Sequence, residues 1–332
     1  NNSAVCGVTY EALKVVHYMG QLPVMLNKNA RNALVIGFGI GVTTSTIAQH
    51  PLESIDCVEI CPDVRKAAPH FEKFNLGVWK NPKVNFIDGD GRNFLLLTEK
   101  TYDIISCDPV HPTLGSGSLY TTEYFRLCKS RLNPDGIICQ YLPLHKLTGD
   151  DLKTLLNTFY TVFPDSMVWI AQTHGVLVGS PREIRLSFSQ IQLLIGRTAD
   201  PFFKDPYLAA STLMMNKTGI KAFLGNHTRV NTDNHPVLEY FSPESFQFKN
   251  HLDNITKLLN VRQPVDQLLS NVPNPVLLSR YINGQTLYLQ GIFHHNYGQK
   301  RDAFQFLHQA YTKNPENREI QMFYNYYRRR GR

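Results

Sequence analysis

The chain has 332 residues, 42% of them hydrophobic, so it is long enough to bury one large core and an appended module. Its formal net charge is +7, but outside a short basic cluster at residues 328–332 the basic residues are scattered without interleaved aromatic residues. Nucleic acid is therefore not an expected partner. No apolar run approaches the about 18 residues that a membrane-spanning helix requires.

Strands and helices are expected to alternate along the first half of the chain. Apolar runs predict seven strands, at residues 33–36, 54–59, 84–87, 102–107, 136–141, 166–171 and 175–179. Helices are expected between them at residues 43–50, 120–132 and 150–163. Such alternation predicts a parallel sheet covered on both faces. Only Gln172-Thr-His174 separates the last two strands, which are therefore expected to form an antiparallel hairpin.

The first predicted strand runs into three closely spaced glycines, Gly37, Gly39 and Gly41. Glycines at this spacing let the backbone turn tightly and bring its N–H groups close to a ligand at a helix N-terminus. The third glycine follows too soon for the dinucleotide fingerprint. The loop instead looks like the first motif of class I S-adenosylmethionine-dependent transferases. The second strand ends on Glu59, where a carboxylate can hold the two hydroxyls of a ribose.

The third predicted strand ends in an acidic turn flanked by glycines, Asp88-Gly-Asp90-Gly91. An exposed Asp90 can accept a hydrogen bond from an adenine amino group, or it can cap the helix that follows. Together with the glycine loop and Glu59, this turn predicts a nucleoside pocket at the carboxyl edge of the parallel sheet.

The pattern of the chain changes near residue 181. Residues 181–250 are irregular, with a helical stretch at 189–195 and a turn leading into a short strand at 231–240. Beyond about residue 254 the chain is expected to be helical, and residues 287–315 have the spacing of one tetratricopeptide helix pair. The small residues Gly291, Ala303 and Ala310 would let its two helices approach closely. This pair either packs on the core or binds a partner.

We therefore expect four parts in the chain. They are a remnant of an N-terminal hairpin with a lead-in helix (1–30), a nucleoside-binding α/β transferase-like domain (31–180), an irregular extension packed on the core (181–250) and a helical tetratricopeptide-like module (251–332).

The six cysteines have neither the spacing of a disulfide framework nor that of a zinc site, so no metal is expected. Cys57, Cys107 and Cys139 fall at predicted buried strands, where a reduced thiol behaves as a small apolar residue. Reduced thiols and the lack of a visible secretory signal predict a cytoplasmic protein.

Further motifs follow the fourth predicted strand, in the order Asp108-Pro-Val-His111-Pro and Leu119-Tyr120-Thr-Thr-Glu-Tyr-Phe. Joined to the glycine loop, Glu59 and the acidic turn, they resemble the spermidine synthase (polyamine aminopropyltransferase) family over about residues 10–150. The resemblance is closest to bacterial spermidine-synthase-like domains often fused to a membrane segment. It implies a class I S-adenosylmethionine-dependent transferase-like (Rossmann-like) fold, α/β with a seven-stranded sheet and a C-terminal α-helical tetratricopeptide-like extension.

The resemblance also implies a function in polyamine biosynthesis and gives particular residues roles in binding the donor and in the reaction. The donor of the family is decarboxylated S-adenosylmethionine, whose ribose would be held by Glu59 and whose adenine would contact Asp90. The donor site would be completed by Gly37, Gly39, Gly41 and Gly91. Asp108 would lie beside the transferring carbon and help deprotonate or orient the attacking amine.

Two further implications concern the acceptor and the partners. His111 or Tyr120 would help Asp108 to position the small-molecule amine acceptor. Family members commonly form homodimers, and the closest subgroup predicts a membrane segment before Asn1, which would tether the domain to the inner face of a membrane.

The sequence also departs from the family pattern. Ile40 stands where the family usually has the aspartate that anchors the amine of the donor, and His111 stands where it has a second aspartate. The residues that line the acceptor channel in the family fall near Val15 and Val16. The nucleoside half of the site is thus retained while the amine-recognising half is largely absent.

Three functions stay open from the sequence. The first is aminopropyl transfer from decarboxylated S-adenosylmethionine to an amine, and the second is transfer of a methyl or other group from S-adenosylmethionine. The third is a non-catalytic nucleoside-binding or scaffold role.

Overall fold

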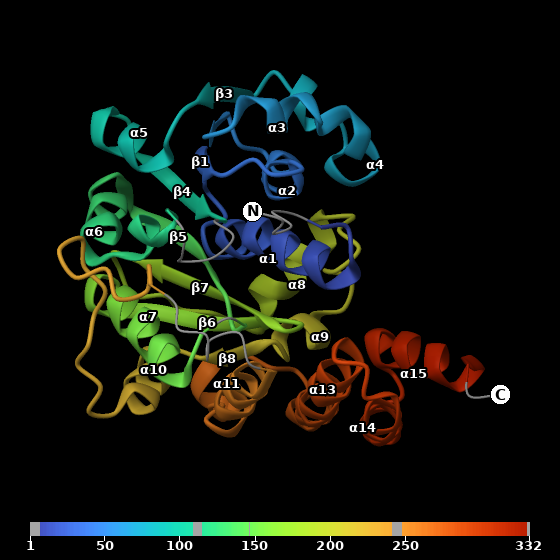
Figure 1. Cartoon of the computed structure of the whole chain (residues 1–332). Coiled ribbons are helices and arrows are strands. Elements are labelled where there is room, and N and C mark those ends of the chain that lie inside the picture. Colours follow the sequence, from blue (N-terminus) through green and yellow to red (C-terminus); the bar gives the residue numbers. More distant parts are fainter. Residues whose placement is uncertain (1–6, 109–114, 146, 241–247, 331–332) are drawn as a thin grey trace.

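The computed structural model describes residues 7–108, 115–145, 147–240 and 248–330, built around one twisted sheet (Figure 1). The described strands are β1 (Asn32–Ile36), β2 (Ser54–Glu59), β3 (Val84–Asp88), β4 (Tyr102–Cys107), β5 (Leu132–Leu142), β6 (Asp165–Ala171), β7 (His174–Ser180) and β8 (Leu213–Met215). They lie in the order β3-β2-β1-β4-β5-β7-β6-β8. Strands β1 to β5 run parallel, whereas β7 is antiparallel to both β5 and β6.

The structure confirms all seven predicted strands and the predicted hairpin, but the count of seven was wrong. An eighth strand, β8, pairs antiparallel with β6 at the edge of the sheet, where Met215 lies opposite Val168. It has only three residues, Leu-Met-Met, which is too short to show the alternation that identifies a strand in a sequence.

The short strand expected within residues 231–240 is also absent, since this segment forms turns. Its first residue, Asn231, is buried, and its side chain accepts a hydrogen bond from the Leu238 N–H (3.2 Å). The same side chain donates to the Tyr120 carbonyl oxygen (3.0 Å). The asparagine amide therefore satisfies backbone groups that a neighbouring strand would otherwise pair.

Helices cover both faces of the sheet and form most of the second half of the chain. Those of the first half are α1 (Tyr10–Leu26), α2 (Val42–Ala48), α3 (Pro62–Lys66), α4 (Glu72–Asn75), α5 (Gly91–Leu97), α6 (Thr122–Ser130) and α7 (Gly149–Val162). Three short 3₁₀ helices accompany them, at Ala68–Phe71, Val78–Lys80 and Gly117–Tyr120. Those of the second half are α8 (Phe188–Arg197), α9 (Pro206–Ala210), α10 (Lys217–Leu224), α11 (Phe248–Asn260), α12 (Val265–Leu268), α13 (Pro275–Asn296), α14 (Lys300–Lys313) and α15 (Arg318–Arg330).

The core has two sides because successive residues of a strand point to opposite faces of a sheet. Leu34 of β1 joins a cluster with Tyr124 of α6 and Phe159 of α7. On the opposite face, α1 contributes Met19 to a cluster that includes Trp169 of β6. Both faces of the sheet are therefore buried, as the predicted parallel arrangement requires.

The helices α13 and α14 approach each other closely. A Cβ atom added to Gly291 of α13 would lie only 2.8 Å from Leu307 of α14, so a larger residue there would force the helices apart. Tyr288 and Ile292 of α13 are buried in the same cluster as Ile138 of β5. These helices thus share a core with the sheet, and a tetratricopeptide-like character of residues 251–332 stays a prediction.

A buried ion pair links the first helix to the last. The Lys14 Nζ of α1 lies 2.6 Å from Oε1 of Glu319 in α15, and the two side chains are 1% and 3% exposed. The Tyr10 hydroxyl donates to the same carboxylate oxygen (2.8 Å). Since α1 also lines the cavity described below, the C-terminal helices support one wall of that cavity.

Two further observations concern the described part of the chain. None of its helices is both long enough and apolar enough to cross a membrane. Its cysteines are free thiols, four of them buried, and no group of histidine, cysteine or acidic side chains there could hold a metal ion.

Candidate functional site

A cavity of about 480 Å³ lies where β1, β2 and β4 end, at the predicted edge of the sheet. Glu59, Asp90 and Asp108 all line it, together with Gly37, Gly39 and Gly91. The carboxylate residues at the ends of three separate strands therefore line one cavity, because parallel strands end at the same edge of a sheet.

The glycine loop has the backbone conformation that requires glycine. Gly37, Gly39 and Gly41 have φ angles of +89°, +54° and +85°, a region that other residues rarely adopt. Gly41 does not line the cavity; it precedes α2, and a Cβ atom there would lie 2.6 Å from the Phe38 ring. Its role is therefore to shape the loop rather than to contact a ligand.

Glu59 holds this loop in place. Its Oε2 accepts hydrogen bonds from the N–H groups of Phe38 (2.7 Å) and Gly39 (3.4 Å), and its Oε1 accepts from the Cys61 N–H (2.9 Å). The N–H groups of Phe38 and Gly39 are therefore directed at Glu59, whereas the sequence predicted that the N–H groups of this loop would approach the ligand. A carboxylate has about four acceptor sites, so Oε1 retains capacity for a ligand hydroxyl.

Asp90 caps a helix and also lines the cavity, so the capping role leaves the predicted contact with adenine possible. Its Oδ1 accepts a hydrogen bond from the Asn93 N–H (2.8 Å), which caps α5, and its side chain also lines the cavity. The next residue, Gly91, lies directly against β1, where a Cβ atom would collide with Ile36. The close approach of α5 to β1 brings Asp90 to the cavity.

Asp108 follows β4 and is half-buried in the cavity wall. Burial raises the pKa of its carboxyl group to about 6, and nearby His174 partly opposes this rise. An acid whose pKa lies near neutrality can exchange a proton with a bound amine, which makes Asp108 the candidate acid–base group at this end.

The other two predicted acceptor residues have different outcomes. His111 lies outside the described residues. Tyr120 is fully buried, does not line the cavity, and donates its hydroxyl to the Tyr141 carbonyl oxygen (3.1 Å). The assignment of Tyr120 to acceptor positioning is therefore corrected, because its hydroxyl faces the core beneath the cavity.

Sequence reasoning missed three residues that line the cavity beside Asp108, namely Tyr141, His145 and His174. Tyr141 lies in β5, and His174 begins β7 just after the hairpin turn. The one signal in the sequence was the position of His174 at the tip of a hairpin between two buried strands. Such a turn needs no imidazole, so a histidine there could have indicated a functional role.

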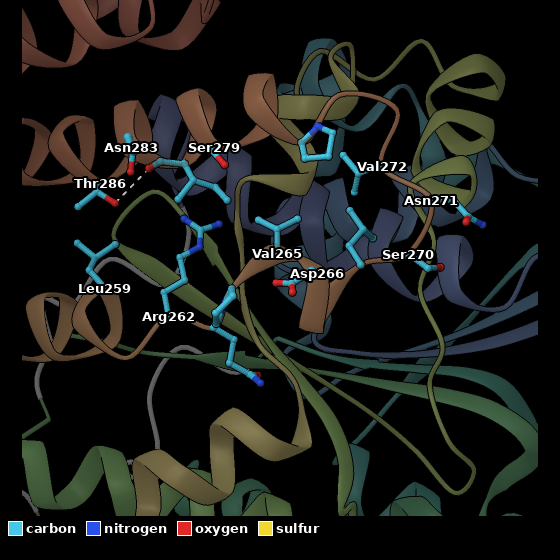
Figure 2. A pocket seen from close by; sticks show the side chains of 15 residues that line it. Leu259, Arg262, Val265, Asp266, Ser270, Asn271, Val272, Ser279, Asn283 and Thr286 are labelled. Atoms are coloured by element: carbon cyan, nitrogen blue, oxygen red, sulfur yellow. Dashed lines mark hydrogen bonds between the residues drawn. The ribbon is translucent and has the colours of Figure 1, made fainter.

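A second cavity, of about 870 Å³, lies between α11, α12 and α13 (Figure 2). Arg262 enters it, and its Nη2 donates to the carbonyl oxygens of Ser211 and Leu213, the latter at 2.8 Å. Burial lowers the pKa of this guanidinium to about 9. Arg262 and Asp266 are the titratable groups among the described lining residues. The hydrogen bonds of Arg262 connect the backbone at the start of β8 to the C-terminal helices. We assign this cavity no catalytic role.

Comparison with known proteins gives a consistent picture of the first half of the chain. Residues 13–175 match the family model described as spermine/spermidine synthase domain. Polyamine aminopropyltransferases from Klebsiella pneumoniae and Shigella boydii are each 32% identical to this chain over 121 residues. That stretch is 36% of this chain and 42% of each relative, so the chain spans less than half the length of the curated relatives it matches.

A solved structure, of a probable spermidine synthase from Corynebacterium glutamicum, is similar in fold, with a TM-score of 0.53. Its sequence is 14% identical, and the match covers 68% of this chain and 81% of that chain.

Proposed function

Since residues 13–175 belong to the spermine/spermidine synthase domain family, we propose that this protein transfers an aminopropyl group from decarboxylated S-adenosylmethionine to an amine acceptor. One observation carries the proposal: Glu59, Asp90 and Asp108, which lie at the ends of three different strands, line one cavity.

The donor would occupy the end of the cavity formed by the glycine loop. Glu59 would hold the ribose hydroxyls through Oε1, and Asp90 would accept a hydrogen bond from the adenine amino group. Ile40 lines the same cavity and is apolar, so it cannot pair with the ammonium group of the donor. Recognition of the donor would therefore depend on its nucleoside part.

Asp108 would act at the opposite end, where the amine must attack. The ammonium form of an amine carries no free electron pair, so it must lose a proton before it can form the new C–N bond. A carboxylate beside it holds the positive charge and orients the nitrogen. As the C–N bond forms, the C–S bond of the sulfonium breaks and its electron pair stays on sulfur, which leaves methylthioadenosine.

The proposal is tested by calorimetric binding of decarboxylated S-adenosylmethionine, S-adenosylmethionine and methylthioadenosine, followed by turnover with amine acceptors. We expect the decarboxylated donor to bind and to be consumed, and Asp108→Asn to bind it but lose turnover. Asp63→Asn is the matched control, because Asp63 is an exposed residue of α3 paired with Lys66. Methyl transfer from S-adenosylmethionine would instead favour the second function, and binding without any turnover would favour the non-catalytic one.

The remaining expectations stay predictions. We infer a cytoplasmic location from the buried free thiols of Cys57, Cys107 and Cys139. The homodimer and the tether through a preceding membrane segment are implied by the resemblance alone.

A further inference from the structure

Three polar side chains from distant parts of the sequence form a hydrogen-bonded chain at the acceptor end of the cavity. The Tyr141 hydroxyl lies 2.8 Å from Nδ1 of His174, and Nε2 of His174 lies 3.0 Å from Oε1 of Glu11 in α1. Tyr141 and His174 both line the cavity that contains Asp108. The His174 side chain is 15% exposed, so the chain is largely withdrawn from water.

The protonation states of Glu11 and Tyr141 determine which atoms donate and which accept in these hydrogen bonds. Glu11 is held ionised: burial would raise its pKa, but hydrogen bonds from His174 and Asn296 outweigh burial and lower it. An ionised carboxylate only accepts, so Nε2 of His174 carries a proton and Nδ1 is left to accept the hydroxyl proton of Tyr141. Burial, with the nearby negative charges of Asp108 and Glu11, raises the pKa of Tyr141 well above its usual range. Tyr141 is therefore a hydroxyl that can pass a proton on but does not ionise.

Several other groups share this environment. The titratable groups around His174 are Glu11 of α1, Asp108 after β4, Tyr141 of β5, His145 after β5 and His251 of α11. The His145 ring centroid lies 5.2 Å from that of His174. Burial lowers the pKa of His251 to about 4, so His251 is neutral at physiological pH. Glu11 is thus the acid hydrogen-bonded to His174, and it stabilises a positive charge on that imidazole.

The carboxylates of the cavity are unequally available to an acceptor. Glu59 is engaged by three backbone N–H groups, and Asp90 caps α5. Among the described lining residues, this leaves Asp108 as the carboxylate without a hydrogen-bonded partner. The other described residues lining this end carry no carboxylate: Val15, Val16 and Leu119 are apolar, Ser116 and Ser118 are uncharged, and His145 and His174 bear imidazoles. A polyamine would place a second ammonium there without a carboxylate to pair with it, which is costly away from water.

Building on the proposed function, we propose that Tyr141, His174 and Glu11 form a proton-accepting chain that serves an acceptor amine with one cationic nitrogen and an apolar body. Asp108 holds the ammonium. Its nitrogen gives one proton to the Tyr141 oxygen while Tyr141 passes its own proton to Nδ1 of His174, and Glu11 pairs with the imidazolium formed. The freed electron pair of the nitrogen makes the C–N bond, and the electron pair of the breaking C–S bond goes to sulfur. The imidazolium later returns its proton to water.

The acceptor class is tested with the full chain and decarboxylated S-adenosylmethionine, using hexylamine and phenethylamine against 1,4-diaminobutane and spermidine. We expect kcat/KM for the monoamines to exceed that for the polyamines at least about tenfold, since discrimination by an unpaired polar group is large. Preference for 1,4-diaminobutane or spermidine would overturn the assignment of the acceptor.

The proton-accepting chain is tested by His174→Gln and Glu11→Gln at saturating acceptor. We expect His174→Gln to lower kcat about 100-fold and to leave an acidic limb of kcat that protonation of Asp108 alone sets. Glu11→Gln removes the charge that stabilises the imidazolium, so it should also lower kcat and change the pH profile of kcat. Tyr141→Phe, which keeps the ring, should match His174→Gln in kcat.

His251→Gln is the control, because it makes the same change in a neighbouring histidine outside the cavity lining. An unchanged pH profile in both His174→Gln and Glu11→Gln, with donor binding intact, would show that the chain is only structural. Failure of the wild-type protein to bind any donor would instead refute the proposed function first, and calorimetry distinguishes the two results.

Discussion

The two ends of the cavity are built in different ways. The donor end comes from three strand-to-helix turns, each a short continuous stretch around residues 37–41, 59–61 and 90–91. The acceptor end comes from α1, the 3₁₀ helix at Gly117–Tyr120, β5 and β7, with α13 behind them, and only Asp108 belongs to a strand-end motif. Local backbone geometry therefore fixes the donor end, whereas tertiary packing places the residues of the acceptor end.

This difference matters for specificity. A turn such as the glycine loop must keep its residues because the φ angles and the bonds to Glu59 depend on them. The acceptor end can change one side chain at a time on a fixed frame, so the acceptor of a family member can change while the donor is retained.

The largest expected effect concerns the support of the acceptor end. Lys14→Met leaves the buried charge of Glu319 without its ion-pair partner, and breaking such a pair costs about 3–5 kcal/mol. We expect the free energy of unfolding in urea to fall by about this amount. The double variant Lys14→Met with Glu319→Gln removes both charges and keeps an oxygen for the Tyr10 hydroxyl, so it should regain part of the loss. A single variant as stable as wild type would show that α1 does not depend on α15.

The next effect concerns the donor end alone. In Glu59→Gln, the side-chain NH₂ would face one or more of the N–H groups that Glu59 now accepts from. We expect the Kd of the donor to rise about 100-fold, about 2.7 kcal/mol, because both the loop and the ribose contact are lost. Isothermal calorimetry measures this, with Asp63→Asn as control. Unchanged affinity would show that Glu59 only shapes the loop.

Asp108 gives an effect of intermediate size on stability, with a definite pH dependence. Because burial raises its pKa to about 6, the folded state holds this proton more tightly than the unfolded state. Stability is therefore lost as pH rises from about 4, the unfolded pKa, to about 6, and the penalty is complete above that pH. Asp108→Asn should be more stable than wild type at pH 8 by about 1–2 kcal/mol, a figure reduced for the partial exposure of the group. Urea unfolding should show this difference vanish near pH 4; an equal difference at both pH values would contradict the shift.

How much of this could be predicted from the sequence differs between the two ends. The apolar runs and glycines predicted β1 to β7 and the positions of Glu59, Asp90 and Asp108, because strand ends and turns are encoded locally. The three-residue β8 was missed because it has no pattern of its own and exists through pairing with β6.

The acceptor end was harder to predict for a related reason. Glu11 and His174 are 163 positions apart in the sequence and meet only because α1 packs beside the tip of the β6–β7 hairpin. Tyr120 was selected because it belongs to a family motif, but its side chain is buried in the core, and Tyr141 from the next strand lines the cavity instead. Which side of a segment faces a cavity depends on packing that spacing alone does not reveal.

The smallest expected effect tests whether the C-terminal helices tune the acceptor end. The Asn296 side chain, at the end of α13, donates to Oε2 of Glu11 (2.8 Å), but this hydrogen bond is exposed. Asn296→Ala should therefore lower kcat only about threefold, by allowing Glu11 to turn away from His174, and should leave the Kd of the donor unchanged. Asn296→Gln, which can still donate, should recover part of the loss in steady-state assays. A change in donor affinity without a change in kcat would mean that α13 acts on the whole cavity rather than on its acceptor end.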